Sequence, residues 1–176
     1  MLSKEELLNL AQTNAEAFNN EIASANGNVD LSEVDFSGVN LEGIEFINVD
    51  LTSSSFSDSH LLEVKFDGCD LTSTDFTRAT IVESSFNEAI LNGADFSYAK
   101  VDYCNFADAD LAGAILQSAD LTNSDFSGAE NLNASRFDED TIWPDNEYLP
   151  DEFDSSYSSD LSSLRDEEED FGQSDY

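Results

Sequence analysis

Large apolar residues recur at every fifth position over about a hundred residues, and this interval constrains the fold more than any other feature of the chain. From Leu31 to Phe126, all 20 positions of the series hold Leu, Ile, Val or Phe. An α-helix advances about 140° past a full turn in five residues, so its apolar stripe would wind around it. A straight β-strand fails because an odd interval alternates between its two faces. The period therefore predicts a chain that changes direction every five residues.

A second series, two residues earlier in each unit, runs from Val29 to Ser124 and holds only small or β-branched residues. The residue between the two series is mostly polar. Each unit thus reads small, polar, large, polar, polar, which suits an extended in-out-in piece followed by two outward residues at a corner. Successive coils would stack through backbone hydrogen bonds, as in other solenoids.

The alternation of leucine-type residues and phenylalanine predicts the number of sides. Like residues stack in columns only if that number is even, and two sides enclose no core, so four is the smallest workable answer. Rings stacked about 4.8 Å apart suit offset aromatic packing. One predicted column holds Phe46, Phe66, Phe86, Phe106 and Phe126, and the opposite one holds Phe36, Phe56, Phe76, Phe96 and finally Leu116.

The repeat resembles a known sequence motif. Ala94–Tyr98 (ADFSY) and Ala119–Asn123 (ADLTN) are similar to the alanine-aspartate/asparagine-leucine/phenylalanine unit of the pentapeptide-repeat family, and the likeness spans about residues 27–130. It implies an all-β solenoid, a right-handed quadrilateral β-helix of about five coils. The family is common in bacteria, particularly cyanobacteria, and most members have no known activity. One branch resembles duplex DNA in shape and charge and binds DNA gyrase.

The flanks of the repeat predict caps and a tail. Residues 1–26 read as one capping helix, with Ser3 and Glu6 forming a capping box and Gly27 ending the helix. Beyond the β-helix of residues 27–130, we expect a C-terminal cap over residues 131–150, in which Leu132, Phe137 and Ile142 keep the five-residue spacing. Residues 151–176 contain 10 acidic residues and one arginine and are predicted to be a disordered acidic tail.

Chemistry-bearing motifs are not found. The sequence has no glycine-rich phosphate loop, metal-ligand spacing or nucleophile signature, and it predicts a protein that is not an enzyme and has no cofactor, metal or catalytic residues. Cys69 and Cys104 fall at small inward positions and read as core filler. Two cysteines and the lack of a secretory signal predict a cytoplasmic location, and no apolar run is long enough to span a membrane.

The net charge of −33 predicts what the protein binds. It disfavours direct contact with nucleic acid and favours a protein partner with a basic surface, although it would also simply keep a rod dispersed. Residues 29–130 hold 20 acidic and 3 basic residues, a difference of 17. Over about 24 Å of coil this is about one charge per 1.4 Å, close to duplex DNA. The alternative is therefore a DNA mimic that binds DNA gyrase or another basic DNA-binding protein, and both a monomer and a dimer remain open.

One side of the coil is a candidate for partner binding. We call it the third side, and its inward residues are Leu41, Leu61, Ile81, Val101 and Leu121. It carries outward apolar residues ringed by carboxylates, which suits docking better than charge alone. Stacked aspartates on the other sides are expected to serve partly as turn residues. The candidate partner-binding residues are Glu42, Leu62, Glu63, Val82, Glu83, Asp102 and Tyr103.

Overall fold

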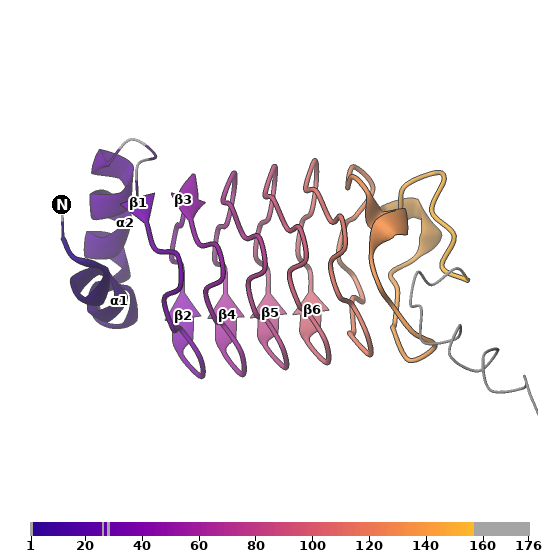
Figure 1. Cartoon of the computed structure of the whole chain (residues 1–176), viewed down its shortest axis with the longest axis horizontal. Coiled ribbons are helices and arrows are strands. Elements are labelled where there is room, and N and C mark those ends of the chain that lie inside the picture. Colours follow the sequence, from indigo (N-terminus) through magenta and orange to yellow (C-terminus); the bar gives the residue numbers. More distant parts are fainter. Residues whose placement is uncertain (1, 26, 28, 157–176) are drawn as a thin grey trace, which may run out of the picture.

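The computed structural model describes residues 2–25, 27 and 29–156 and is a β-helix with a helix pair at one end and an irregular cap at the other (Figure 1). Its described strands are short and parallel. They form a two-stranded sheet, β1-β3, and a four-stranded sheet, β2-β4-β5-β6. The strands are β1 (Val29–Asp30), β2 (Asn40–Glu42), β3 (Val49–Asp50), β4 (His60–Leu62), β5 (Thr80–Val82) and β6 (Lys100–Asp102).

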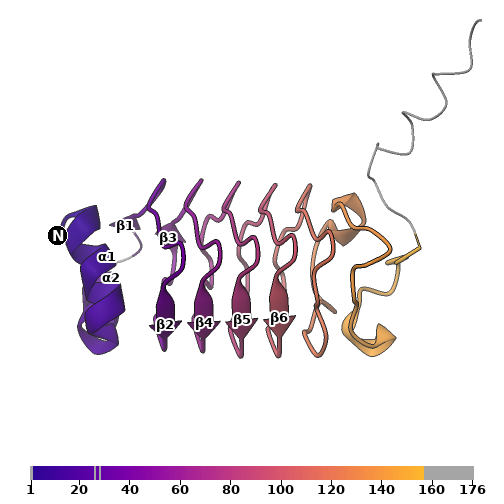
Figure 2. The ribbon, with the colours of Figure 1, turned by 90° about the horizontal axis from the view of Figure 1, so that it is seen from below.

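Every strand pairs with the residues 20 positions further along the chain. Leu41 lies beside Leu61, Leu61 beside Ile81, and Ile81 beside Val101. Isolated bridges such as Asp35 to Ser55 continue the same register on the other sides. Since the repeat has five residues, a register of 20 means four repeats per coil. The strands of the larger sheet consequently line up along one side of the coil, as Figure 2 shows.

Phenylalanine rings fill the centre of the coil in the two predicted columns. Within a column, rings one coil apart are nearly parallel, with centroids 4.3–5.3 Å apart. Between the columns the rings meet edge to face at 5.4–6.3 Å. Both are favourable aromatic geometries, so one set of rings satisfies two packing directions at once.

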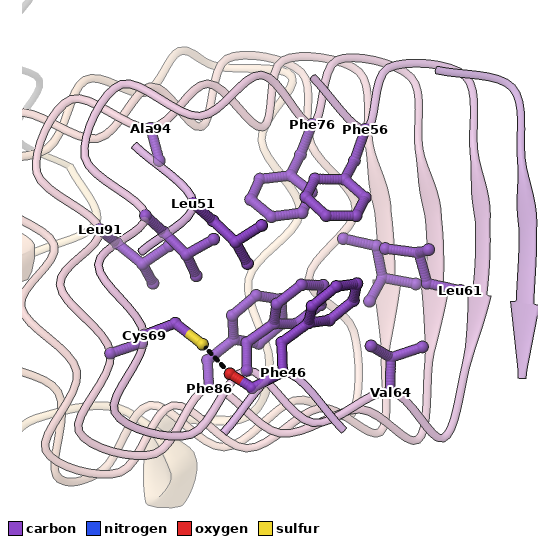
Figure 3. Close-up of a cluster of buried hydrophobic side chains, with 14 of the residues drawn as sticks. Phe46, Leu51, Phe56, Leu61, Val64, Cys69, Phe76, Phe86, Leu91 and Ala94 are labelled. Carbon is purple, nitrogen blue, oxygen red and sulfur yellow. Dashed lines mark hydrogen bonds between the residues drawn. The ribbon is translucent and has the colours of Figure 1, made fainter. Parts of the chain in front are cut away.

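The small inward positions are as tightly enclosed as the large ones. Ala94, Ala114 and Ser124 are completely buried, and Cys69 donates a hydrogen bond from Sγ to the carbonyl of Phe46 (Figure 3). Burial raises the pKa of both Cys69 and Cys104 to about 12. The two cysteines are unpaired core residues, as predicted.

Aspartates at the middle position of each unit hold the corners. Thr77 N–H, for example, donates to Asp75 Oδ1 at 2.8 Å, two residues on. Such a bond satisfies a backbone donor that the turn would otherwise leave unpaired. Nine aspartates between residues 29 and 130 make this contact: Asp30, Asp35, Asp50, Asp70, Asp75, Asp95, Asp110, Asp120 and Asp125.

The N-terminal cap is a pair of helices, and the single helix predicted over residues 1–26 is wrong. α1 spans Lys4–Thr13 and α2 spans Ala15–Ser24, with Asn14 between them. The Asn14 side chain accepts a hydrogen bond from the N–H of Ala17, so it starts a second helix where the sequence pattern suggested continuity. The capping box of Ser3 and Glu6 is confirmed.

The helix pair closes the first coil in the way that the sequence suggested. Phe18 of α2 contacts Phe46 edge to face at 5.2 Å and so ends the aromatic stack. Asn19 donates from its side chain to the Gly43 carbonyl and accepts from the N–H of Glu45, both at 2.9 Å. The amide thus occupies backbone groups that another strand could otherwise pair with.

The regular register ends in the C-terminal cap. Asn131, with a φ of +56°, and a further residue before Ile142 lengthen the bridge spacing to 21 residues at Ile115–Arg136 and 22 at Asp120–Ile142. Leu132 and Phe137 are buried as predicted, but Ile142 is 53% exposed because Thr141 has taken the inward position. The short 3₁₀ helices η1 (Leu132–Ala134) and η2 (Asn146–Tyr148) belong to this cap.

The cap extends further than residue 150, where we placed its end. Phe153 lies 4.7 Å from Trp143 and 5.8 Å from Phe137, ring centre to ring centre. An aromatic residue inside a strongly acidic segment therefore folds back over the last coil, so residues 151–156 belong to the cap. The remainder of the predicted tail, residues 157–176, lies outside the described residues.

The enclosed small positions lead to a first prediction. Replacing Ala94 with Leu adds three carbon atoms where no space exists, and we expect the free energy of unfolding to fall by about 1–3 kcal/mol or more. Urea denaturation followed by circular dichroism measures this. Ala23→Leu, at an exposed position of α2, is the control and should change stability little. Equal midpoints for Ala94→Leu and the wild type would contradict the packing described.

A second prediction separates the hydrogen bond of a corner aspartate from its charge. Asp75→Ala removes the acceptor for Thr77 N–H and should lower the free energy of unfolding by about 0.5–1.5 kcal/mol. Asp75→Asn keeps an acceptor and removes one charge next to Asp95, so it should match or exceed wild-type stability. Thermal melts of both variants make the comparison. Equal losses for the two would show that the charge, and not the hydrogen bond, matters.

Candidate functional site

The sheet β2-β4-β5-β6 forms the third side, which comprises residues 38–43, 58–63, 78–83, 98–103 and 118–123. Its inward residues, such as Leu61 and Ile81, are buried, so the residues on either side of them face outward. The 20-residue register arranges these outward residues in two columns. One holds Asn40, His60, Thr80 and Lys100, and the other holds Glu42, Leu62, Val82 and Asp102.

Leu62 and Val82 form the apolar centre of this surface. They are direct neighbours in the ladder, with Glu42 before them and Asp102 after them. Leu62 is 38% exposed and Val82 is half-buried. A shallow hollow of about 400 Å³ lies here, lined by Asn40, Leu41, Glu42, His60, Leu61, Leu62, Thr80 and Val82.

The acidic edge of the surface runs along one corner. Glu63, Glu83 and Tyr103 are exposed corner residues, with φ between +52° and +55°. The structure therefore brings all seven predicted residues onto one side of the coil. The carboxylates of Glu42, Glu63 and Glu83 have no hydrogen bond or ion pair among the described residues, whereas Asp102 accepts from the side chain of Asn123 at 2.9 Å.

The opposite edge has a different charge. His60, Thr80 and Lys100 follow one another there, and Arg78 lies at the corner. Arg78 donates two hydrogen bonds to Asp58, from Nε at 2.8 Å and from Nη2 at 2.7 Å, so that local charge is neutralised. The surface is thus acidic along one edge and neutral to basic along the other, and its apolar centre lies between them.

Sequence reasoning missed three members of this surface. Tyr98 is 67% exposed at the corner beside Lys100, and Ile142 continues the column of Lys100 and Asp120. Adding 20 to Arg78 and Thr80 would have found Tyr98 and Lys100, while the two inserted residues of the cap concealed Ile142. Four of the six large apolar residues exposed in the described structure therefore lie along the third side: Leu62, Tyr98, Tyr103 and Ile142.

Most other acidic residues of the coil already have partners. The nine corner aspartates bind backbone N–H groups, and the hydroxyl of Ser37, followed by its N–H, lowers the pKa of Asp35 below its usual value. Lys65 pairs with Glu45 at 2.7 Å, one coil away. Within the described residues, Glu33, Glu88, Asp108 and Glu130 are unpaired as well but belong to other sides or corners. In this part of the chain, unpaired carboxylates surround exposed apolar residues only on the third side.

No other chemistry is apparent in the part of the chain that the structure describes. No cluster of three or more histidine, cysteine or acidic side chains there could hold a metal ion. The two thiols are buried, and their raised pKa keeps them protonated at neutral pH. Among the described residues, no helix has both the length and the apolar character that crossing a membrane requires.

Comparison with known proteins identifies the repeat. A sequence model described as "Pentapeptide repeat region" matches residues 24–96, and one described as "Pentapeptide repeats (8 copies)" matches residues 89–128. Together they span more than half of the chain. No curated protein matches significantly.

Solved structures of similar proteins agree. The pentapeptide repeat protein Rfr23 from the cyanobacterium Cyanothece 51142 is 23% identical, with a TM-score of 0.52 over 73% of this chain and 99% of that one. The pentapeptide repeat protein alr5209 from Nostoc Pcc 7120 is 27% identical, with a TM-score of 0.35 over 74% and 85%. QnrB1, a plasmid-mediated fluoroquinolone resistance protein, is 21% identical, with a TM-score of 0.35 over 61% and 81%. The fold is that of Rfr23, and the chain belongs to the pentapeptide-repeat family.

Proposed function

We propose that this protein is a non-enzymatic interaction module whose third side binds a protein with a basic surface. The observation that carries the proposal is the set of carboxylates on Glu42, Glu63 and Glu83, which the fold does not use, beside the exposed side chains of Leu62 and Val82. Corner aspartates have a structural reason to be where they are. These glutamates have none within the described structure.

The arrangement has the anatomy of a protein interface. Apolar anchors at the centre supply affinity when they are desolvated, while charges at the rim steer a partner of opposite sign and fix its orientation. A right-handed, four-sided coil of about five turns would hold these groups on a rigid face. Rigidity lowers the entropy lost on binding, because few side chains and no loops need to be ordered.

Affinity capture tests this function. The wild-type protein, used as bait in an extract of its own organism, should recover a partner that the double variant Leu62→Glu/Val82→Lys loses. Ile90→Glu is the matched control, since Ile90 is exposed to a similar degree, 41%, but lies on another side. Recovery of the same partners by the double variant and the wild type would exclude the third side as the binding surface.

The second candidate is a DNA mimic directed at DNA gyrase. The observation in its favour is the charge spacing of about one per 1.4 Å, close to that of duplex DNA at about one per 1.7 Å. Against it, nine of the 20 acidic residues in residues 29–130 serve the corners, so much of the charge needs no ligand to explain it.

A supercoiling assay separates the two candidates. We expect micromolar protein to leave gyrase activity unchanged, because the unused carboxylates cluster on one side instead of following the whole rod as phosphates do. The assay measures conversion of relaxed plasmid to the supercoiled form at several protein concentrations. Inhibition by the wild type that Glu63→Asn/Glu83→Asn leaves intact would favour the mimic over the third-side module.

A further inference from the structure

We infer that the element of the partner that docks on the third side is an amphipathic α-helix lying along the long axis of the coil, with its Lys and Arg residues on one flank only. This inference rests on the proposed docking function and adds the kind of partner that the surface fits. Three features lead to it: the state of the backbone, the spacing of the apolar residues and the asymmetry of charge.

The backbone of the third side excludes docking by strand addition. β2, β4, β5 and β6 are hydrogen-bonded to one another in sequence, so their N–H and C=O groups are used within the ladder. The free edge beside β2 is covered by the helix pair, where Asn19 binds the Gly43 carbonyl and the N–H of Glu45. A partner therefore meets side chains alone, and its own backbone must already be satisfied. A helix meets that condition, whereas a strand does not.

The spacing of the apolar residues suits a helix. Leu62 and Val82 are one coil apart, about 4.8 Å, and one helical turn rises about 5.4 Å. Apolar residues at positions i and i+3 or i+4 of a helix aligned with the coil would thus contact Leu62 and Val82 in turn. The column from Glu42 to Asp102 covers three coil steps, about 14 Å, which corresponds to about ten helical residues.

The charge asymmetry fixes which flank of that helix is basic. Glu63 and Glu83 follow one edge of the apolar centre and have no partners among the described residues. The other edge presents His60, Thr80 and Lys100, and the carboxylate of Asp58 beyond them is already paired with Arg78. Lys or Arg on the flank beside the glutamates gains attraction, while a cation on the other flank faces Lys100. A helix basic all round would therefore fit less well than one that is basic on one flank.

Selection from a peptide library tests this inference. A phage library of random 16-residue peptides is selected on the full-length protein and counter-selected on Leu62→Glu/Val82→Lys. We expect the recovered peptides to share apolar residues at i, i+3 or i+4, and i+7, with Lys or Arg offset to one flank. Binding of the most enriched peptide, followed by fluorescence anisotropy, should weaken about tenfold or more with the double variant.

Matched variants report on the charge. Glu63→Asn/Glu83→Asn should weaken binding of the same peptide several-fold, because Asn tolerates the positive φ of both positions and removes only the charges. Ile90→Glu should leave it unchanged. Circular dichroism should show that the peptide gains helix on binding.

Specific results would overturn the inference. These are enrichment of peptides with strand-like alternation, binding that is indifferent to Glu63 and Glu83, or no peptide that depends on Leu62 and Val82. If affinity capture still yields a partner that depends on Leu62 and Val82, the docking function stands and only the helical partner fails. If captured partners are also indifferent to these residues, both fail.

Discussion

The parallel register of 20 residues is the constraint on which the whole molecule depends. It places each side chain directly above a side chain of the same class one coil earlier, so that Phe stacks on Phe and small residues on small ones. The backbone ladder and the ring stack support each other, because both repeat at about the same strand spacing. A solenoid of this kind has contacts only between neighbouring coils, so a fault in the register of one coil displaces the next coil as well.

The ends show how that dependence is managed. At the N-terminus, Phe18 continues the aromatic contacts from a helix, and Asn19 occupies backbone groups at the edge of the first coil. At the C-terminus, two inserted residues break the register, and Trp143 and Phe153 close the core with tilted ring contacts. Both devices replace strand pairing by side chains and so remove an edge that another chain could extend.

Function is left to the residues that folding does not require. The interior is fully occupied by packing, and the aspartates of the corners are occupied by turn hydrogen bonds. The third side retains an apolar pair between an acidic edge and a neutral to basic one. This division explains why composition alone is a poor guide to the role of the protein: most of its charge has a structural use, and the part with a proposed binding role is small and confined to one side.

The sequence by itself determined the period, the inward residues, the two phenylalanine columns and the seven residues of the acidic docking surface, because a strict five-residue repeat turns position in the chain into position in space. Only the tertiary structure decided where that rule fails. Asn14 divides the N-terminal helix through a side-chain cap, Thr141 displaces Ile142 from the interior, and Phe153 joins the cap from an acidic segment. Each depends on contacts between residues with no periodic relation, which a repeat cannot encode. The same holds for the pairing of Arg78 with Asp58, which makes the two edges of the third side electrostatically different.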